Sequence, residues 1–542
     1  MTKQEWKKFR GSAEKPDHIM LSLNGPAENS RTVSWRTSRN VENGYILYRK
    51  KGSQSEWMKS DAKKNSFDTD MDSSNHFFAD MKDLEADTQY EYICGNEVFS
   101  SDVFTFRTSR ENIDKFTFLA LSDIQTGGPE PPPDYTFLGQ FIKGVLKEHP
   151  EIEFILTAGD NTNCGQTDLQ WCGLFEGLKG IIESVPFMMS MGNHDDFGYE
   201  DYYTGKGKYY SEFTEYFSNM LKYSYPQNGP EGRKTANYSF DYGDAHFAIA
   251  SVTGYEIMNE WLKKDAKNSD KKWKFSVHHF PVCYSTVCLE IEDTYPALKD
   301  GLESFDIVFS GHEHCFARSF PRRNNGLFDR PSQGTVHYNL GSGNRNPSSR
   351  GIVSKAWNCV TYGHEQELSM FALVTVDGEK CTLTSYLEDG RIVDSCVIDK
   401  ENDVILPYSC APVHRKTRLK FKGYDIGIIN ENTLPKNIDG LWYISPGQLV
   451  SFIGGEVLRT QGRIHLEIYG KKADFTENSD VAETGDGNFK MQGKCLRLDN
   501  GQLFVPVEDF CKAFNMHPMY FPENNFISIE CEEEKTYCPV QP

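Results

Sequence analysis

The sequence lacks any continuous apolar run of about 18 residues, the length that a helix needs to cross a lipid bilayer. No membrane-spanning helix is therefore expected. Residues 1–8 include three lysines, but no apolar segment follows them, so we expect no signal peptide. These two absences predict a cytoplasmic protein, or an exported one if a leader has been removed.

Basic residues are in short supply, with 58 Lys and Arg against 78 Asp and Glu and a formal net charge of -20. Because nucleic-acid backbones are held mainly by Lys and Arg, this balance argues against a general nucleic-acid-binding surface. The 14 cysteines are spread along the whole chain, and none of them form a Cys-x-x-Cys pair. A dense disulfide framework is excluded, which leaves buried thiols, or a few disulfides if the protein is exported.

Residues with metal-binding side chains occur at one recurring place, the ends of short apolar runs that we predict to be buried strands. The runs are 116–122 before Asp123 and Gln125, 154–157 before Asp160, 185–189 before Asn193, His194 and Asp195, 273–277 before His278 and His279, and 305–310 before His312 and His314. In open α/β sheets, ligands bind beyond the carboxyl ends of the strands. Oxygen and imidazole donors suit borderline-hard divalent cations, whereas a soft-metal site would need cysteine. The pattern predicts a site for two metal ions.

The third of these motifs, Gly192-Asn193-His194-Asp195, also contains groups suited to catalysis. The imidazole of His194 can move a proton near neutral pH. The carboxylate of Asp195 is expected to orient that ring.

Together and in this order, the five motifs resemble those of the calcineurin-like metallophosphoesterases over residues 116–399. The resemblance implies an α/β fold, a four-layer α/β/β/α sandwich, with two divalent metal ions. By position, one metal would be held by Asp123, Asp160 and His314, and the other by Asp160, Asn193, His279 and His312. Asp160 would then bridge two ions about 3.5–4 Å apart. His194 falls on the family's catalytic histidine.

The region before these motifs consists of short alternating runs between residues 18 and 107, which predict a β-sandwich. Its segments 32–37, 83–90 and 104–108 resemble the fibronectin-III-like N-terminal domain of purple acid phosphatases. No cluster of ligand-type residues occurs there, so we interpret it as a rigid module packed beside the catalytic domain. The predicted organisation is a tail (1–17), this β-sandwich (18–110), the metallophosphoesterase domain (111–400), a linker (401–416) and an accessory α+β domain (417–542).

The chain departs from the pattern of its family at three positions. Gln125 replaces the histidine of the commoner first motif. Its neutral amide oxygen favours manganese or iron over zinc at the first site. The alternative is that Gln125 lies behind the ligands and forms a hydrogen bond to Asp123 or to a metal-bound water. Asn163 stands where purple enzymes have a tyrosine ligand, so no iron–tyrosinate colour is expected. Around Cys288 the chain has no counterpart of the histidine that assists the leaving group.

Two further segments lie within the predicted catalytic domain. The proline-rich stretch 129–133 is expected to form a stiff loop over the rim of the site. Eight tyrosines between residues 199 and 225 either stack on a nucleoside or aryl leaving group or pack an irregular insertion.

The last 126 residues, 417–542, contain a weak internal repeat. Each half is predicted as strand, short helix and strand, around 443–468 in the first half and around 504–529 in the second. This resembles the small module at the N-terminus of copper amine oxidases, although no copper-site motif is present. We expect the module to contact other proteins or cell-surface material.

Two functions stay open from the sequence. The first is a dinuclear phosphoesterase, resembling acid phosphatases, that hydrolyses small phosphate mono- or diesters by attack of a metal-activated water; its metals would be manganese, iron or zinc. The second is a metal-binding scaffold on the same fold that is weakly active or inactive, which the substitution at Gln125 allows. The retained His194 favours the enzyme.

Overall fold

The computed structural model describes most of the chain and divides it into two compact units. The described residues are 11–127, 133–196, 215–286, 294–346, 355–363, 368–411, 417–422, 424–426, 433–498, 501–522 and 526–532. The first unit contains residues 1–322, 330–354 and 358–409, and the second contains 323–329, 355–357 and 410–542. The first unit therefore includes both the predicted β-sandwich and the predicted catalytic domain.

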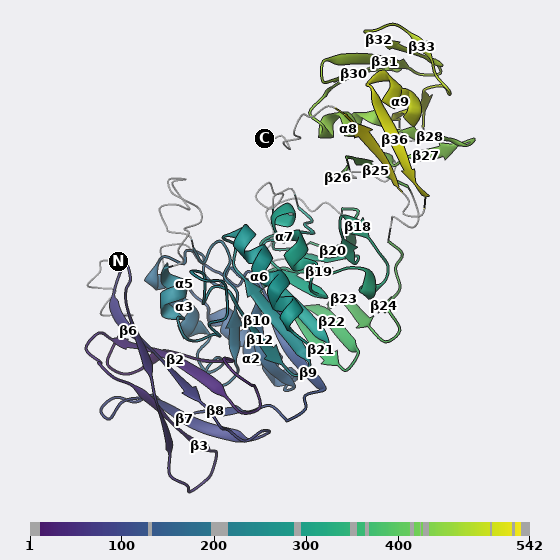
Figure 1. Cartoon of the computed structure of the whole chain (residues 1–542). Helices are drawn as coiled ribbons and strands as arrows, with labels where there is room; N and C mark the ends of the chain where they lie inside the picture. Colours follow the sequence, from purple (N-terminus) through teal and green to yellow (C-terminus); the bar gives the residue numbers. More distant parts are fainter. Residues whose placement is uncertain are drawn as a thin grey trace. The chain divides into compact units, whose positions relative to one another are not determined.

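The N-terminal part of the first unit is a sandwich of two four-stranded sheets (purple in Figure 1). One sheet has the order β1 (Asp17–Ser22), β2 (Arg31–Ser38), β6 (Ser73–Met81) and β5 (Lys63–Asp68). The other has the order β4 (Met58–Asp61), β3 (Tyr45–Lys50), β7 (Gln89–Gly95) and β8 (Phe104–Arg107). Alternating apolar side chains such as Trp35, Phe77 and Tyr92 fill the space between the sheets. The predicted β-sandwich is confirmed.

The rest of the first unit, called the catalytic part after the predicted catalytic domain, consists of two seven-stranded sheets packed face to face. The first has the order β11 (Phe187–Met189), β10 (Ile152–Thr157), β9 (Lys115–Leu121), β21 (Met370–Asp377), β22 (Lys380–Leu387), β23 (Ile392–Asp399) and β24 (Val404–Leu406). The second has the order β12 (Tyr238–Tyr242), β13 (Ala245–Ala250), β14 (Trp273–His278), β15 (Ile307–Ser310), β19 (Val336–Leu340), β16 (Phe316–Ser319) and β20 (Asn358–Tyr362). Strands β9, β10 and β11 are parallel to one another, as are β13, β14, β15 and β19.

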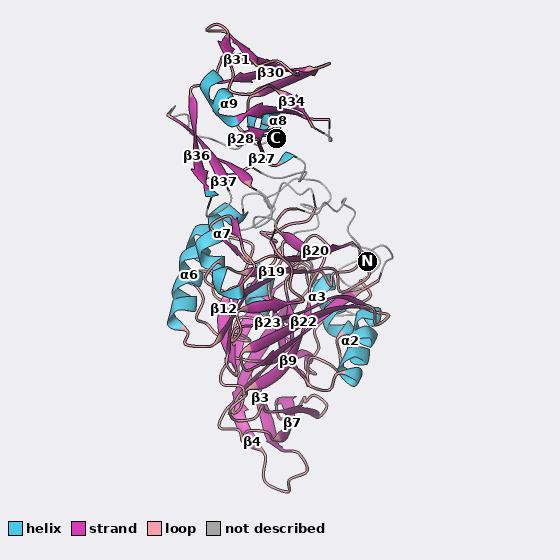
Figure 2. Ribbon diagram, turned by 90° about the vertical axis from the view of Figure 1, so that its right-hand side faces the viewer, coloured by secondary structure: helices cyan, strands magenta, loops and turns pink. Residues whose placement is uncertain are grey.

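Helices cover the outer faces of both sheets, as Figure 2 shows. On one side lie α2 (Thr136–Glu148) and α3 (Asp168–Gly177), and on the other lie α6 (Tyr255–Asn268) and α7 (Thr294–Leu302). The space between the sheets is filled by aromatic rings; Phe118, for example, meets Phe247 edge to face at 5.3 Å and Phe154 in a stack at 5.1 Å. The predicted four-layer α/β/β/α sandwich is confirmed.

The N-terminal sandwich packs directly against the catalytic part. Met20, Leu23, Ala27 and Phe67 belong to the same hydrophobic cluster as the catalytic sheets. The backbone N–H of Leu21 donates to the carbonyl of Ile182 at 2.7 Å, and the hydroxyl of Tyr92 donates to Glu183 O at 2.8 Å. These contacts agree with the interpretation of this domain as a packed neighbour.

The second unit is an α+β module in which the internal repeat is visible. The first half contains β28 (Leu441–Ile444), α8 (Pro446–Phe452), β29 (Glu456–Thr460) and β30 (Arg463–Ile468). The second half contains β35 (Leu503–Pro506), α9 (Val507–Ala513), β36 (Met516–Phe521) and β37 (Phe526–Cys531). Strands β28 and β35 pair antiparallel, with Ile444 opposite Val505.

Other expectations from the sequence can be compared with the described residues. The predicted linker begins too early, because β24 (Val404–Leu406) pairs with β23 through Ile398 and Ile405 and belongs to the first catalytic sheet.

No helix among the described residues is long and apolar enough to cross a membrane. The 12 described cysteines are free thiols, most of them buried, which favours the buried-thiol alternative. The predicted loop at 129–133 lies almost entirely outside the described residues.

His246 is predicted to stabilise the catalytic sandwich in a pH-dependent way. Its Nδ1 lies 2.7 Å from Asp241 of β12, and its Nε2 lies 2.7 Å from Asp265 of α6. Burial opposes the charged ring, but the two carboxylates outweigh burial and raise its pKa from 6.5 to about 9. The stabilisation is therefore complete below pH 6.5 and is lost as the pH rises through 9.

We expect His246→Gln to lower the free energy of unfolding by about 2 kcal/mol at pH 6, with a difference that shrinks toward pH 9.5. Urea denaturation at several pH values measures this effect. His149→Gln is the matched control, because the more exposed pair of His149 and Glu151 contributes little. A loss for His246→Gln that is the same at pH 6 and pH 9.5 would contradict the assignment.

Candidate metal centre

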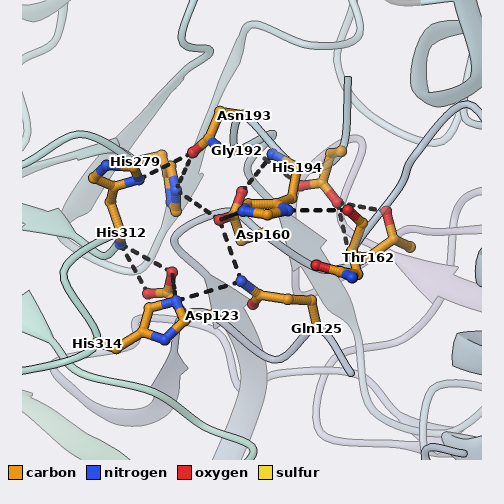
Figure 3. Close-up of polar contacts among 12 residues, drawn as sticks. Asp123, Gln125, Asp160, Thr162, Gly192, Asn193, His194, His279, His312 and His314 are labelled. Carbon is orange, nitrogen blue, oxygen red and sulfur yellow. Dashed lines mark hydrogen bonds and ion pairs between the residues drawn. The ribbon is translucent and has the colours of Figure 1, made fainter. Parts of the chain in front are cut away.

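The predicted ligands converge at one edge of the two catalytic sheets (Figure 3). Asp123 follows β9 by two residues, Asp160 follows β10 by three, and Asn193 follows β11 by four. His279 comes directly after β14, while His312 and His314 follow β15. Because the strands within each group are parallel, their carboxyl ends meet at the same edge.

The backbone at the ligands adopts a conformation that is uncommon for residues with side chains. Asp123, Asp160, His312 and His314 have φ angles of 51°, 52°, 69° and 52°, in the left-handed region. Each such residue costs roughly 1 kcal/mol, which the packed strands on both sides must offset. The turn that follows each strand thereby directs its ligand into the site.

Two glycines of the motifs are required by close approach to ligand carboxylates. A Cβ atom on Gly192 would lie 2.1 Å from Asp160 Oδ1, and one on Gly311 would lie 2.4 Å from Asp123 Oδ2. Any side chain at either position would therefore displace a carboxylate.

One group of donors surrounds the amide of Asn193. Asn193 Oδ1 lies 3.0 Å from His279 Nε2 and 3.0 Å from His312 Nδ1. His279 Nε2 also lies 3.1 Å from Asp160 Oδ2. The Nδ1 of His279 donates to the carbonyl of Ala158 at 2.8 Å, which fixes the ring and leaves Nε2 as the candidate ligand atom.

A second group surrounds His314. Its Nε2 lies 3.2 Å from Asp123 Oδ1 and 3.4 Å from the amide nitrogen of Gln125. The same amide nitrogen lies 3.4 Å from Asp160 Oδ2. Asp160 therefore touches both groups, at the position of a bridging carboxylate.

The amide of Gln125 shows whether the side chains of the cluster suit a cation. Its Oε1 atom is buried and has no hydrogen-bond partner among the described residues, which is costly for an acceptor. A half-turn of the amide exchanges its oxygen and nitrogen and brings the oxygen into the cluster, where a cation would supply the missing partner. With metal–donor bonds of about 2.1 Å, neighbouring donors lie about 3.0 Å apart in an octahedron and about 3.4 Å apart in a tetrahedron. The donor spacings fit that range.

The charged groups of the cluster change one another's pKa values. The pKa of Asp160 is held well below its usual range, because the facing rings of His279 and His194 outweigh the effect of burial. Burial lowers the pKa of His279, but Asp160 outweighs it and raises the value to about 9. The site is therefore built around negative charge that needs positive neighbours, which is what a cation-binding site requires.

His194 lies beside the cluster, with its side chain 16% exposed. Its Nδ1 donates to the carbonyl of Asn163 at 2.9 Å, and its Nε2 lies 4.0 Å from Asp160 Oδ2. Its backbone N–H donates to Asp160 Oδ1 at 2.9 Å. The ring is thus held at the mouth of the site by a neighbouring loop.

The predicted role of Asp195 is wrong. Its carboxylate does not hold the ring of His194; it accepts hydrogen bonds from the backbone of Gly192, Asn161 and Thr162 at 2.8–3.2 Å. Burial raises the pKa of Asp195 to about 6, with the charge of Asp160 adding to the effect. Asp195 therefore fixes the loops that carry Asp160 and Asn193. The adjacent Asn163 carbonyl, and not a carboxylate, orients the imidazole.

Asn163 does not take the place of a tyrosine ligand. Its side-chain amide donates to the carbonyl of Gly127 at 2.7 Å, outside the cluster. Among the described tyrosines, Tyr135 donates to the carbonyl of Asn161, and Tyr216 and Tyr225 are buried by packing. The tyrosines at 199–210 lie outside the described residues, as does Cys288.

His278 is buried, with its pKa lowered to about 4 by burial and its Nδ1 bonded to Phe280 O.

Glu313 is a positioning residue whose role the sequence did not reveal. It is 1% exposed and lies between His312 and His314. Its carboxylate accepts hydrogen bonds from the backbone of Ser285 and Thr286 at 2.7 Å and from the amide of Asn339 at 3.1 Å. A glutamate flanked by two ligand histidines was the available signal. It joins the loops beyond β14 and β15 and so keeps His279 near His312.

Comparison with known protein families agrees with this geometry. Residues 16–108 match the family described as purple acid phosphatase, N-terminal domain, and residues 116–316 match calcineurin-like phosphoesterase. The chain carries a purple acid phosphatase N-terminal domain followed by a calcineurin-like phosphoesterase domain. Enzymes of these families use a dinuclear metal centre. Both matches end before the second unit, so its resemblance to the copper amine oxidase module stays a prediction.

Some of the related proteins are named purple acid phosphatases, and others are named probable inactive purple acid phosphatases. Purple acid phosphatase 18 of Arabidopsis thaliana is 27% identical over 274 residues, covering 48% of this chain and 56% of that protein. Probable inactive purple acid phosphatase 27 of the same plant is 23% identical over 391 residues, covering 62% and 60%. The chain thus spans less than two thirds of their length. The solved purple acid phosphatase PPD1 from yellow lupin seeds shares the fold, with a TM-score of 0.57, 18% identity and coverage of 71% and 74%.

The position of Asp160 between the two donor groups predicts the metal content of a variant. Asp160→Asn replaces a charged carboxylate by a neutral amide, so we expect it to lose metal from both positions. Elemental analysis by mass spectrometry of the purified protein measures the stoichiometry. Asn163→Ala is the control, since its side chain lies outside the cluster, and should keep the wild-type content. If Asp160→Asn keeps two equivalents of metal, Asp160 does not bridge the two ions.

Proposed function

We propose that the protein is a dinuclear-metal-dependent hydrolase of phosphate mono- or diesters. The observation that carries this proposal is the convergence of seven side chains from five strand ends, with donor atoms 3.0–3.4 Å apart. When bound, the two cations would acidify a water to give a nucleophile and would offset charge on the phosphoryl oxygens.

The residues of the chain have separate tasks in this reaction. Asp160 carries charge between the two donor groups, and the Nδ1 bond of His194 to Asn163 O fixes the tautomer of that ring. The Nε2 atom of His194 lies on the side of Asp160, 4.0 Å from Oδ2, and there it would donate a hydrogen bond or a proton to a phosphoester oxygen. The bond of His279 to Ala158 O keeps that ring in place as charge develops.

An inactive binding protein on the same fold is the second candidate. It is supported by Gln125, which departs from the commoner motif, and by relatives named probable inactive purple acid phosphatases. Metal content together with hydrolysis of p-nitrophenyl phosphate and bis-p-nitrophenyl phosphate separates the two functions. Two bound metals with no turnover of either ester would favour the binding protein.

His194 is predicted to act in turnover without holding metal. We expect His194→Ala to keep wild-type metal content but to lose roughly 10²–10⁴-fold in kcat, the usual contribution of a positioned acid or base. Steady-state assays on metal-saturated protein measure the loss. His149→Ala, on the surface away from these strand ends, serves as the control. Normal kcat in His194→Ala would exclude His194 from the reaction.

Gln125 is predicted to set the metal preference of the first site. With Asp123, Asp160 and His314, its amide oxygen gives an oxygen-rich set that suits manganese or iron better than zinc. Gln125→His should strengthen binding of the first metal by on the order of 10–100-fold and shift the ranking toward zinc.

Calorimetric titration of metal-free protein with Mn²⁺ and Zn²⁺ measures both affinities. Asn163→His is the matched control, because it adds an imidazole outside the cluster. Identical affinities and ranking in the wild type and Gln125→His would show that Gln125 is not a ligand.

A further inference from the structure

A polar cavity of about 230 Å³ lies in the phosphoesterase domain, at the edge where β13 ends. Its lining includes Lys222, Arg233 and Lys234, together with Asn237, Ser251 and Thr253. None of these residues belongs to the metal-binding motifs.

The positive charge of this cavity is only partly neutralised. Lys222 Nζ bonds to the neutral amide oxygen of Asn65 at 3.1 Å, and Arg233 Nη1 donates to the hydroxyl of Thr253 at 3.0 Å. Among the described residues, only Lys234 of the three pairs with a carboxylate, that of the exposed Glu231. Two uncompensated cations in one cavity are notable in a chain with a net charge of -20. Such a cavity attracts an anion.

A buried hydroxyl in the same cavity lacks a partner. Ser251 is 1% exposed, and its Oγ atom makes no hydrogen bond among the described residues. A buried hydroxyl without a partner is unfavourable. An acceptor oxygen from a ligand would satisfy it.

The guanidinium of Arg233 lies beside the amino end of α6. Its N-cap is Gly254, with φ of 74° and no side chain to cap the first turn. A Cβ on Gly254 would lie 2.5 Å from Cζ of Arg233, so the glycine allows the guanidinium to lie against the start of the helix.

The cavity is close to the metal centre. Strands β13 and β14 are parallel, with Ala250 opposite His278, so Ser251 and His279 leave the sheet side by side. Neighbouring strands are about 4.8 Å apart. An anion in the cavity is therefore on the order of 10 Å from the ligand atom of His279.

We propose, on the basis of the proposed hydrolase function, that this cavity receives a second anionic group of the substrate while the reacting phosphoester lies at the metal centre. The preferred substrates are then small molecules with at least two phosphate groups. Arg233 and Lys222 bind the distant phosphate and are specificity residues, and neither takes part in bond cleavage.

Paired substrates test this proposal in the metal-loaded, full-length protein. We expect KM to be at least about tenfold lower for glucose 1,6-bisphosphate than for glucose 6-phosphate, as charge-assisted hydrogen bonds to phosphate would give. Arg233→Gln and Lys222→Gln should bring the two KM values together and leave kcat/KM for p-nitrophenyl phosphate unchanged. Arg233→Lys should keep part of the preference, and Arg107→Gln, in the N-terminal domain, should keep all of it.

A binding measurement separates the cavity from the proposed activity. Calorimetry with 1,6-hexanediylbisphosphonate, which is not hydrolysed and is long enough to reach both positions, should show weaker binding to Arg233→Gln than to the wild type, with equal binding of hexylphosphonate. If the wild type hydrolyses no ester but this difference is present, the hydrolase proposal fails and the anion cavity stands. Equal binding of 1,6-hexanediylbisphosphonate to the wild type and Arg233→Gln would overturn the cavity proposal, whatever the activity.

Discussion

The buried charge of Asp160 is the constraint on which the rest of the site depends. This carboxylate is 1% exposed, and a carboxylate in such a place stays ionised only where opposite charge and hydrogen-bond donors surround it. Its neighbours are His279 at 3.1 Å and the backbone N–H of His194 at 2.9 Å, which come from different strand ends. The two sheets must therefore keep their spacing for Asp160 to remain charged. The aromatic layer around Phe118 sets that spacing.

The sequence was sufficient to predict the fold class and to predict which side chains meet at the candidate site, since each of them follows a short apolar run that is typical of a buried strand. Asp123, Asp160 and His279 lie where strand periodicity put them, because parallel strands bring their carboxyl ends together. Two predictions were wrong: the direction in which the Asp195 carboxylate points, and the residue at which the linker begins. The carboxylate of Asp195 points to backbone amides and away from the imidazole, which adjacency in sequence does not reveal. β24 is three residues long and too short for its pattern to be recognised.

Other features depend on contacts between distant segments and could not be predicted from one sequence. Glu313 was visible as a residue between two histidines, but its partners Ser285 and Asn339 come from separate loops. The cavity at Arg233 requires the end of β13, the segment 218–222 and the turn at 231–235 to meet, and no local pattern links them. Strands β4 and β5 carry mostly exposed polar residues, so they lack the apolar alternation that marks a half-buried strand.

The packing of the N-terminal sandwich onto the catalytic sheets bears on the ancestry of the protein. The boundary between the two matched families falls between residues 108 and 116, yet Met20, Leu23 and Phe67 share a hydrophobic core with the sheets beyond that boundary. A chain cut there would leave apolar surface in water on both pieces. What is inherited as two domains thus folds as one body, so recombination that exchanges either domain alone must also supply a matching face.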